Sequence, residues 1–158
     1  MKGALSFPTW PALQGATVTP HSFAGVSERR VLPPPPCVLV VDDQPFVRDV
    51  LARAQRGMGL EALPAASGEE ALELCGLDAG RVGLVLLDLR MPGKGGLAAL
   101  AELRQERPEL PVLLVCWGPG ELSEQEAIRQ GARALLRKPL RLGELERAVR
   151  GCLPAGIR

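Results

Sequence analysis

Residues 38–45 read VLVVDDQP, an apolar run that ends on two adjacent aspartates and then breaks at Gln44 and Pro45. An apolar run of this length without polar alternation is typical of a strand that is buried on both faces of a sheet. Two neighbouring carboxylates repel each other and raise each other's pKa, so the pair is costly unless a cation compensates for it. A compensating group is therefore expected from elsewhere in the chain.

Four further apolar runs of strand length follow. They are the weak LEALP (60–64), VGLVLLD (82–88), PVLLVC (111–116) and ARALLR (132–137). Between the runs, apolar residues spaced by three and four predict amphipathic helices. Five strands alternating with five helices imply a parallel sheet with right-handed crossovers and helices on both faces.

The predicted helices each carry one apolar stripe. Ser67 followed by Glu70 predicts a capping box at the start of the second helix. The stripe residues, helix by helix, are Phe46, Val47, Val50, Leu51 and Ala54; Ala71, Leu72 and Leu74; Leu97, Leu100, Ala101 and Leu103; Ala127 and Ile128; and Leu142, Leu145, Val149 and Cys152.

Charged side chains stand at the ends of three predicted strands. Asp42 and Asp43 follow the first, Asp88 ends the third, and Lys138 follows the fifth. Binding sites of open parallel sheets lie at the carboxyl ends of the strands, so these four groups are expected to converge. Such a set suits Mg²⁺, which takes oxygen ligands and keeps several waters. We expect Asp43 and Asp88 to be direct ligands and Asp42 to act through water.

This arrangement also predicts chemistry with phosphorus. With the cluster neutralised by a metal, one carboxylate can attack a phosphorus atom and form an aspartyl phosphate. The metal and Lys138 together would then stabilise charge on the phosphoryl oxygens, which is most of what phosphoryl transfer requires.

Each of these residues also has a plainer interpretation. Asp42 and Asp43 alone would fit a solvated turn, and Lys138 alone would be an ordinary surface lysine. Their matching positions at strand ends favour a site instead. Cys116, at the end of the fourth strand, is interpreted as a small buried side chain rather than a redox sensor. Trp117 is interpreted as local packing beside the site.

Taken in order, VLVVDD, LVLLDLRMPGKGG, PVLLVC and GARALLRKP closely resemble the receiver domain of two-component response regulators over residues 37–153. The resemblance implies an α/β fold of the flavodoxin-like, CheY-like type. This fold is a doubly wound, five-stranded parallel sheet of strand order 2-1-3-4-5 with five helices.

The resemblance also implies a role for each site residue and a cis peptide before Pro139. It implies Asp88 as the phosphoacceptor, Asp43 as a Mg²⁺ ligand supported by Asp42, the backbone carbonyl of Arg90 as a further ligand, and Lys138 as a contact of the phosphoryl group.

Two positions depart from the family pattern. Cys116 stands where receivers usually have Thr or Ser, and Leu135 where they usually have Tyr or Phe. A thiol is a bulkier and weaker hydrogen-bond donor than a hydroxyl, and Leu135 has no ring to move. We expect phosphorylation to survive both changes, and coupling to the face formed by the fourth helix, fifth strand and fifth helix to be altered.

The favoured hypothesis is a signalling receiver rather than an enzyme in the usual sense. It would be phosphorylated on Asp88, with Mg²⁺, by a sensor histidine kinase or phosphotransfer protein. A degenerate receiver that docks a partner independently of phosphorylation is the alternative. A haloacid-dehalogenase-type phosphatase is disfavoured because Arg90 stands where that class needs a second aspartate.

The length and composition of the chain agree with one domain and a short extension. The 158 residues carry a net charge of +1 with a pI near 7.7, which suggests no nucleic-acid or membrane partner. The four cysteines form no CxxC pair, and a reducing cytoplasm suits them. Neither a signal peptide nor a membrane helix is expected.

The predicted organisation is a proline-rich tail or linker over residues 1–36, a receiver domain over 37–153 and a short tail over 154–158. The tail ends in VLPPPP, which is typical of an extended polyproline II spacer. With no predicted output domain after the receiver, a stand-alone receiver and the terminal receiver of a hybrid sensor kinase both stay open.

Overall fold

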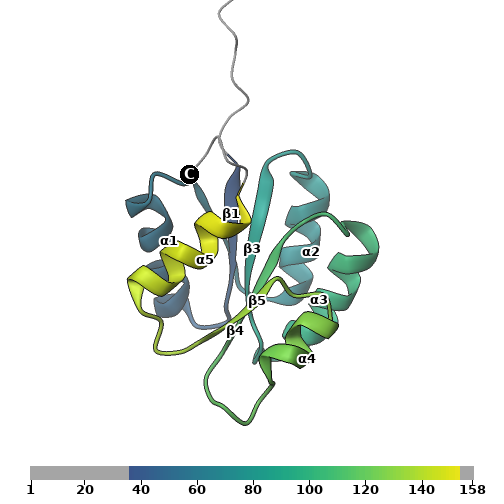
Figure 1. Ribbon diagram of the computed structural model, residues 1–158. Coiled ribbons are helices and arrows are strands. Elements are labelled where there is room, and N and C mark those ends of the chain that lie inside the picture. Colours follow the sequence, from purple (N-terminus) through teal and green to yellow (C-terminus); the bar gives the residue numbers. More distant parts are fainter. Residues whose placement is uncertain (1–35, 154–158) are drawn as a thin grey trace, which may run out of the picture. The chain divides into compact units, whose positions relative to one another are not determined.

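A computed structural model describes residues 36–153 as a parallel sheet between two layers of helices (Figure 1). Strand and helix alternate along the whole of this region, as the apolar pattern predicted. The strands are β1 (Cys37–Val41), β2 (Ala62–Ala65), β3 (Val82–Asp88), β4 (Val112–Cys116) and β5 (Ala134–Arg137). The helices are α1 (Pro45–Gly57), α2 (Gly68–Leu77), α3 (Gly95–Glu106), α4 (Glu124–Arg129) and α5 (Leu142–Cys152).

The strand order is β2-β1-β3-β4-β5, with every neighbouring pair parallel. The predicted doubly wound fold and strand order are therefore confirmed. The central strands β1 and β4 are buried along their whole length, whereas the edge strands β2 and β5 are only partly buried. This difference explains why the apolar run that predicted β2 was weak.

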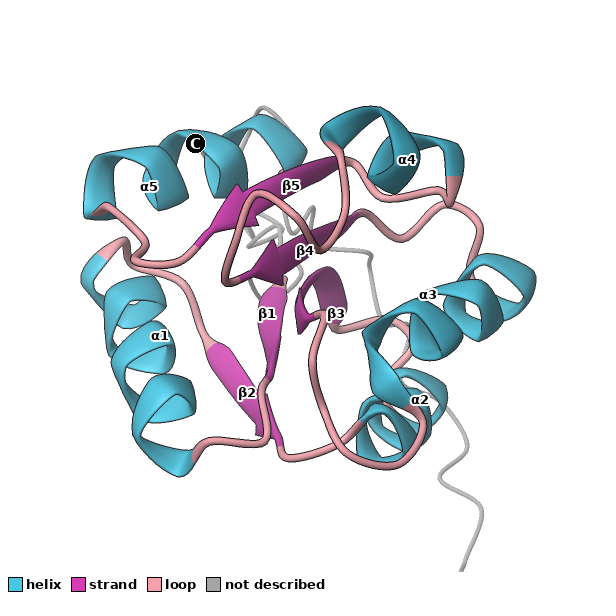
Figure 2. Ribbon diagram, turned by 90° about the horizontal axis from the view of Figure 1, so that it is seen from below, coloured by secondary structure: helices cyan, strands magenta, loops and turns pink. Residues whose placement is uncertain are grey.

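Each face of the sheet has its own apolar core because successive side chains of a strand point to opposite faces. Leu39 and Leu87 pack on the face that α2, α3 and α4 cover, together with Leu103. Val40 and Leu86 pack on the opposite face, which α1 and α5 cover. Figure 2 shows the two helix layers on either side of the strands.

The capping of two helices differs in part from the prediction. Ser67 accepts a hydrogen bond from the backbone N–H of Glu70 at 3.1 Å, but the Glu70 carboxylate bonds the N–H of Ala66 rather than that of Ser67. The predicted capping box is thus only half formed. A complete capping box, which the sequence analysis did not predict, joins Ser123 and Glu126 at the start of α4.

Several apolar residues that were predicted to lie on buried helix stripes are exposed. The stripe of α1 buries Leu51, but Phe46 is 79% exposed at the first turn. A period of three or four residues places side chains within one broad stripe, and only its centre reaches the sheet. The other exposed members of the predicted stripes are Val50, Leu97, Ala101, Ile128 and Leu142.

Gln55 shows the opposite behaviour. This residue of α1 is fully buried, and its amide nitrogen and oxygen have no hydrogen-bond partner among residues 36–153. A polar side chain in an apolar stripe gives no sequence signal of burial, so the stripe of α1 was predicted without it.

The predicted tail lies almost wholly outside the described residues, as does the predicted segment 154–158. Among residues 36–153, no helix has the length and apolar character needed to cross a membrane.

Candidate functional site

The carboxyl ends of β1, β3 and β5 bring the predicted site residues together. Asp42 and Asp43 follow β1 directly, and Asp88 is the last residue of β3. One carboxylate oxygen from each of the three residues lies within 4.8 Å of the others. Residues that are far apart in sequence thus form a single acidic cluster.

Lys138 joins this cluster from the end of β5. Its Nζ donates hydrogen bonds to Asp42 Oδ2 at 2.7 Å and to Asp88 Oδ1 at 2.9 Å. Lys138, Asp42 and Asp88 are 7%, 1% and 3% exposed, so this ion-paired group is almost dry. The sequence predicted that these four charges converge, and the structure places them so.

The segment after β1 is held by bonds that involve Asp42 as well. Its Oδ1 accepts a hydrogen bond from the backbone N–H of Gln44 at 2.9 Å. Its backbone carbonyl accepts one from the Arg48 guanidinium at 2.6 Å. The side chain of Asp42 therefore bonds both Lys138 and the start of α1, which orients its carboxylate.

Gly96 lets the start of α3 lie directly against the end of β3. A Cβ atom at this position would lie 2.3 Å from the carbonyl oxygen of Asp88 and 2.7 Å from the Cα of Leu89. Any larger residue would push the β3–α3 loop, which contains Arg90, away from Asp88. Gly96 is the final glycine of the DLRMPGKGG motif, so the sequence pattern has a packing reason here.

Burial governs the protonation of this cluster. Desolvation raises the pKa of Asp88, and the nearby carboxylates Asp42 and Asp43 raise it further, while the hydrogen bond from Lys138 acts in the opposite direction. For Lys138, desolvation lowers the pKa, but the hydrogen bonds to Asp42 and Asp88 outweigh it, and the pKa lies above its ordinary value. Lys138 is therefore a cation at any physiological pH.

The donor set fits a divalent cation. Asp43 is partly exposed and has no hydrogen-bond or ion-pair partner among the residues that the structure describes. Three carboxylates against one ammonium group leave two negative charges without compensation, which matches one doubly charged ion. All of the converging ligand atoms are oxygens, as Mg²⁺ prefers.

The β4–α4 loop, residues 117–123, borders the cluster. Cys116, just before it, is fully buried, as the sequence analysis expected, and burial raises the pKa of its thiol. The ring of Trp117 lies with its centroid 5.0 Å from Lys138 Nζ, within cation–π range. Glu121, on the same loop, pairs with the side chain of Arg90.

Arg137 is the residue of this region that the sequence analysis missed. Its Nη1 donates to the carbonyl of Gly118 at 2.6 Å, and its Nη2 donates to the carbonyl of Leu122 at 3.2 Å. A cation directly before Lys138 was visible in the sequence, but nothing in the motif indicated which side chain would bond the loop.

Two further predicted positions lie near the end of β5. Leu135 is partly buried and packs against the core on the α2, α3 and α4 side of the sheet. The peptide bond between Lys138 and Pro139 is cis, as the resemblance implied.

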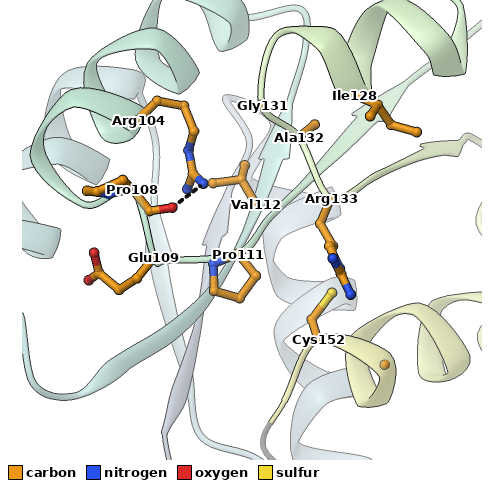
Figure 3. A pocket seen from close by; sticks show the side chains of 11 residues that line it. Arg104, Pro108, Glu109, Pro111, Val112, Ile128, Gly131, Ala132, Arg133 and Cys152 are labelled. Atoms are coloured by element: carbon orange, nitrogen blue, oxygen red, sulfur yellow. Dashed lines mark hydrogen bonds between the residues drawn. The ribbon is translucent and has the colours of Figure 1, made fainter.

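One pocket lies at the opposite end of the sheet, near the amino ends of β4 and β5 (Figure 3). It measures about 480 Å³ and is lined by Arg104, Arg133 and Cys152 among others. None of the predicted site residues lines it, so the charged cluster and this pocket are separate features.

The fold and the strand-end cluster together define a CheY-like α/β protein. The model of the response regulator receiver domain family matches residues 38–150. The chain therefore belongs to the response regulator receiver domain family, which confirms the resemblance seen in the sequence.

Related bacterial proteins agree with this assignment. The DNA-binding transcriptional regulator NtrC of Escherichia coli K12 is 38% identical over 116 residues, which are 71% of this chain and 24% of NtrC. The positive alginate biosynthesis regulatory protein of Pseudomonas aeruginosa is 41% identical over 116 residues, 72% of this chain and 45% of that protein. The chain thus spans less than half the length of these relatives.

Solved receiver structures share the fold. A response regulator receiver protein from Pseudomonas putida superposes with a TM-score of 0.68 at 31% identity, covering 76% of this chain and 99% of that one. The chemotaxis protein CheY4 of Vibrio cholerae superposes with a TM-score of 0.69 at 26% identity, covering 75% and 99%.

Proposed function

We propose that this chain is a phosphoacceptor receiver that takes a phosphoryl group onto Asp88 from the phosphohistidine of a sensor histidine kinase or phosphotransfer protein. The observation that carries the proposal is the position of the Lys138 ammonium group, which bonds both Asp42 and Asp88 at the carboxyl end of the sheet. Membership of the receiver family supports the same function.

In this proposal the carboxylates of Asp42, Asp43 and Asp88 and the backbone carbonyl of Arg90 would hold Mg²⁺. The ion would supply charge neutralisation for the cluster and for the oxygens of an incoming phosphoryl group. The acidic cluster with its two uncompensated charges supports this assignment.

Asp88 and Lys138 would then have separate roles in phosphoryl transfer. A carboxylate oxygen of Asp88 attacks the phosphorus atom while the bond from phosphorus to the donor's imidazole nitrogen breaks, and the imidazole leaves. Lys138 moves its bond from Asp88 to a phosphoryl oxygen and keeps its bond to Asp42, so the ammonium group stays paired throughout. The buried surroundings strengthen this charge pairing because little water competes for it.

Treatment with acetyl phosphate and Mg²⁺ tests the proposal directly. Intact-mass measurement should show one added phosphoryl group that is stable in acid and labile in base. Asp88→Asn should remove the adduct, whereas Asp49→Asn, which changes an exposed carboxylate paired with Arg53 on α1, should retain it. An unmodified mass for the unaltered protein, with the fold intact by circular dichroism, would contradict the proposal.

The degenerate receiver, which docks a partner without phosphorylation, remains the alternative because Cys116 and Leu135 replace the usual hydroxyl and aromatic residues. It predicts partner binding that is indifferent to Mg²⁺ and to Asp88→Asn. The complete set of three carboxylates and one lysine favours the phosphoacceptor. Coupling through the face formed by α4, β5 and α5, and a place in the cytoplasm, stay predictions.

A further inference from the structure

Arg137, the last residue of β5, bonds both ends of the β4–α4 loop. One arm of its guanidinium reaches the carbonyl of Gly118 at 2.6 Å, and the other reaches the carbonyl of Leu122 at 3.2 Å. The first arm also lies 3.5 Å from the Sγ of Cys116. A planar fork that bonds two carbonyls at once restrains a loop more strongly than two independent donors would.

Trp117 is the first residue of this loop. Its ring is half exposed, yet it stays within 5.0 Å of the buried Lys138 ammonium. Its backbone N–H donates to the Glu121 carboxylate at 3.3 Å, and Glu121 in turn pairs with Arg90 on the β3–α3 loop. Besides the ring's contact with Lys138, Arg137 and Arg90 bond the loop, and Leu122 of the loop packs against the core.

We propose that Arg137 is a positioning residue that anchors the β4–α4 loop and so holds the Trp117 ring over the Lys138 ammonium. The thiol of Cys116 cannot supply this restraint, because it is a weak donor and its contact with the Gly118 carbonyl is 3.9 Å long. Charge-assisted bonds from a guanidinium to carbonyls are stronger than neutral ones. The arrangement of the loop is therefore set by β5.

The consequence for signalling rests on the proposed function. In that setting Lys138 would contact the phosphoryl group, and the anchored loop would present Trp117 beside it before any phosphate arrives. The anchoring itself requires neither Mg²⁺ nor phosphate, so it is tested without them.

The test uses tryptophan emission as the signal of loop position. The chain has two tryptophans, so Trp10→Phe makes Trp117 the sole emitter. In this background Arg137→Met and Arg137→Lys are compared with Arg129→Met, which changes an exposed arginine of α4. Acrylamide quenching and backbone hydrogen exchange of residues 117–122 are measured with EDTA present.

Arg137→Met should make Trp117 as easily quenched as a free tryptophan side chain and should speed exchange in the loop about tenfold, the effect of losing a hydrogen bond to a charged donor. Arg137→Lys keeps the charge but not the planar fork, so its quenching and its exchange rates should lie between those of the parent and those of Arg137→Met. Arg129→Met should match the parent.

Unchanged quenching and exchange in a folded Arg137→Met protein would overturn the proposal. If that variant fails to fold, Arg137→Lys decides, because parental quenching in a folded Arg137→Lys protein would show that the fork is not needed. Failure of Asp88 to accept phosphate would contradict the proposed function and leave these measurements unaffected.

Discussion

The cations at the two ends of the sheet have opposite kinds of partner. At the carboxyl end, Lys138 bonds two carboxylates, and the cluster still carries two uncompensated negative charges. At the amino end, the Arg104 guanidinium donates to the backbone carbonyl of Pro108 (Figure 3) and to that of Leu110, and neither carbonyl carries a net charge. The first arrangement leaves an imbalance that a ligand can relieve, whereas the second uses a cation to hold a turn.

This difference shows why the pocket at the amino end is the weaker site candidate. The pocket of about 480 Å³ borders Arg104 and Arg133, but no cluster of potential metal ligands was found there among residues 36–153. The carboxyl end has converging groups and a perturbed pKa at Asp88, which are the marks of a functional site. The two ends therefore differ in the charged groups that they bring together, and pocket volume does not distinguish the functional one.

Removing the cation at each end should give the largest difference between the two ends in phosphorylation rate and in stability. Lys138→Met should lower the rate of phosphorylation by acetyl phosphate about a hundredfold, because one preorganised donor to the phosphoryl group is lost. It should also lower the free energy of unfolding by about 3 kcal/mol, because two buried carboxylates lose their partner. Phosphorylation is followed by intact mass and stability by urea unfolding.

Arg104→Met is the matched change at the amino end. It should cost about 1–2 kcal/mol of unfolding free energy through the lost bonds to backbone carbonyls and leave the rate of phosphorylation unchanged. If acetyl phosphate phosphorylated the Lys138→Met protein and the parent at equal rates, the functional distinction between the two ends would be lost.

The uncompensated charge at the carboxyl end predicts a stabilising substitution. Asp43→Asn should raise the free energy of unfolding by about 1 kcal/mol in EDTA, because it removes one of three mutually repelling carboxylates. In Mg²⁺ the advantage should shrink or reverse, because the parent gains more from the bound ion. Urea unfolding with EDTA and with Mg²⁺ measures both effects.

Asp49→Asn is the control for this comparison. Asp49 is exposed and pairs only with Arg53, so its loss should change stability by no more than a few tenths of a kcal/mol in either solution. A lower stability for Asp43→Asn in EDTA would mean that the cluster is not repulsive.

Some features of the fold and the site could be predicted because they leave a pattern in the sequence, and others leave none. Central strands are long apolar runs, and a parallel sheet brings their carboxyl ends together, so Asp42, Asp88 and Lys138 could be placed near one another from sequence. The same logic does not reach Arg137, because its partners are backbone carbonyls of a loop, which no residue pattern encodes.

Helix faces were predicted less well for a related reason. Spacing indicates which residues share a face but not how far that face is covered, so Phe46 was expected to be packed and is exposed. Gln55 was overlooked because burial of a polar side chain depends on the neighbours that enclose it. Both cases depend on tertiary packing, which sequence periodicity does not contain.

The smallest expected effect compares one cysteine at each end. Cys152 lines the amino-end pocket and is partly exposed, whereas Cys116 is fully buried at the carboxyl end. Burial raises the pKa of both thiols, so at pH 7 each holds less thiolate than a free cysteine, and reactivity should increase as the pH rises toward 9. Access separates the two, because Cys116 reacts only when the structure opens locally.

Iodoacetamide labelling with peptide mapping should therefore modify Cys152 first and Cys116 at least about tenfold more slowly. Cys75 is a useful internal standard, because burial raises its pKa to about 11 and it should stay unlabelled over the same time. In the Arg137→Met protein, release of the β4–α4 loop should expose Cys116 and so reduce the difference in labelling rate between Cys116 and Cys152. The labelling rate of Cys152 should stay the same. Equal labelling of Cys116 and Cys152 in the unaltered protein would show that the carboxyl end is open, contrary to the buried arrangement on which the contrast between the ends depends.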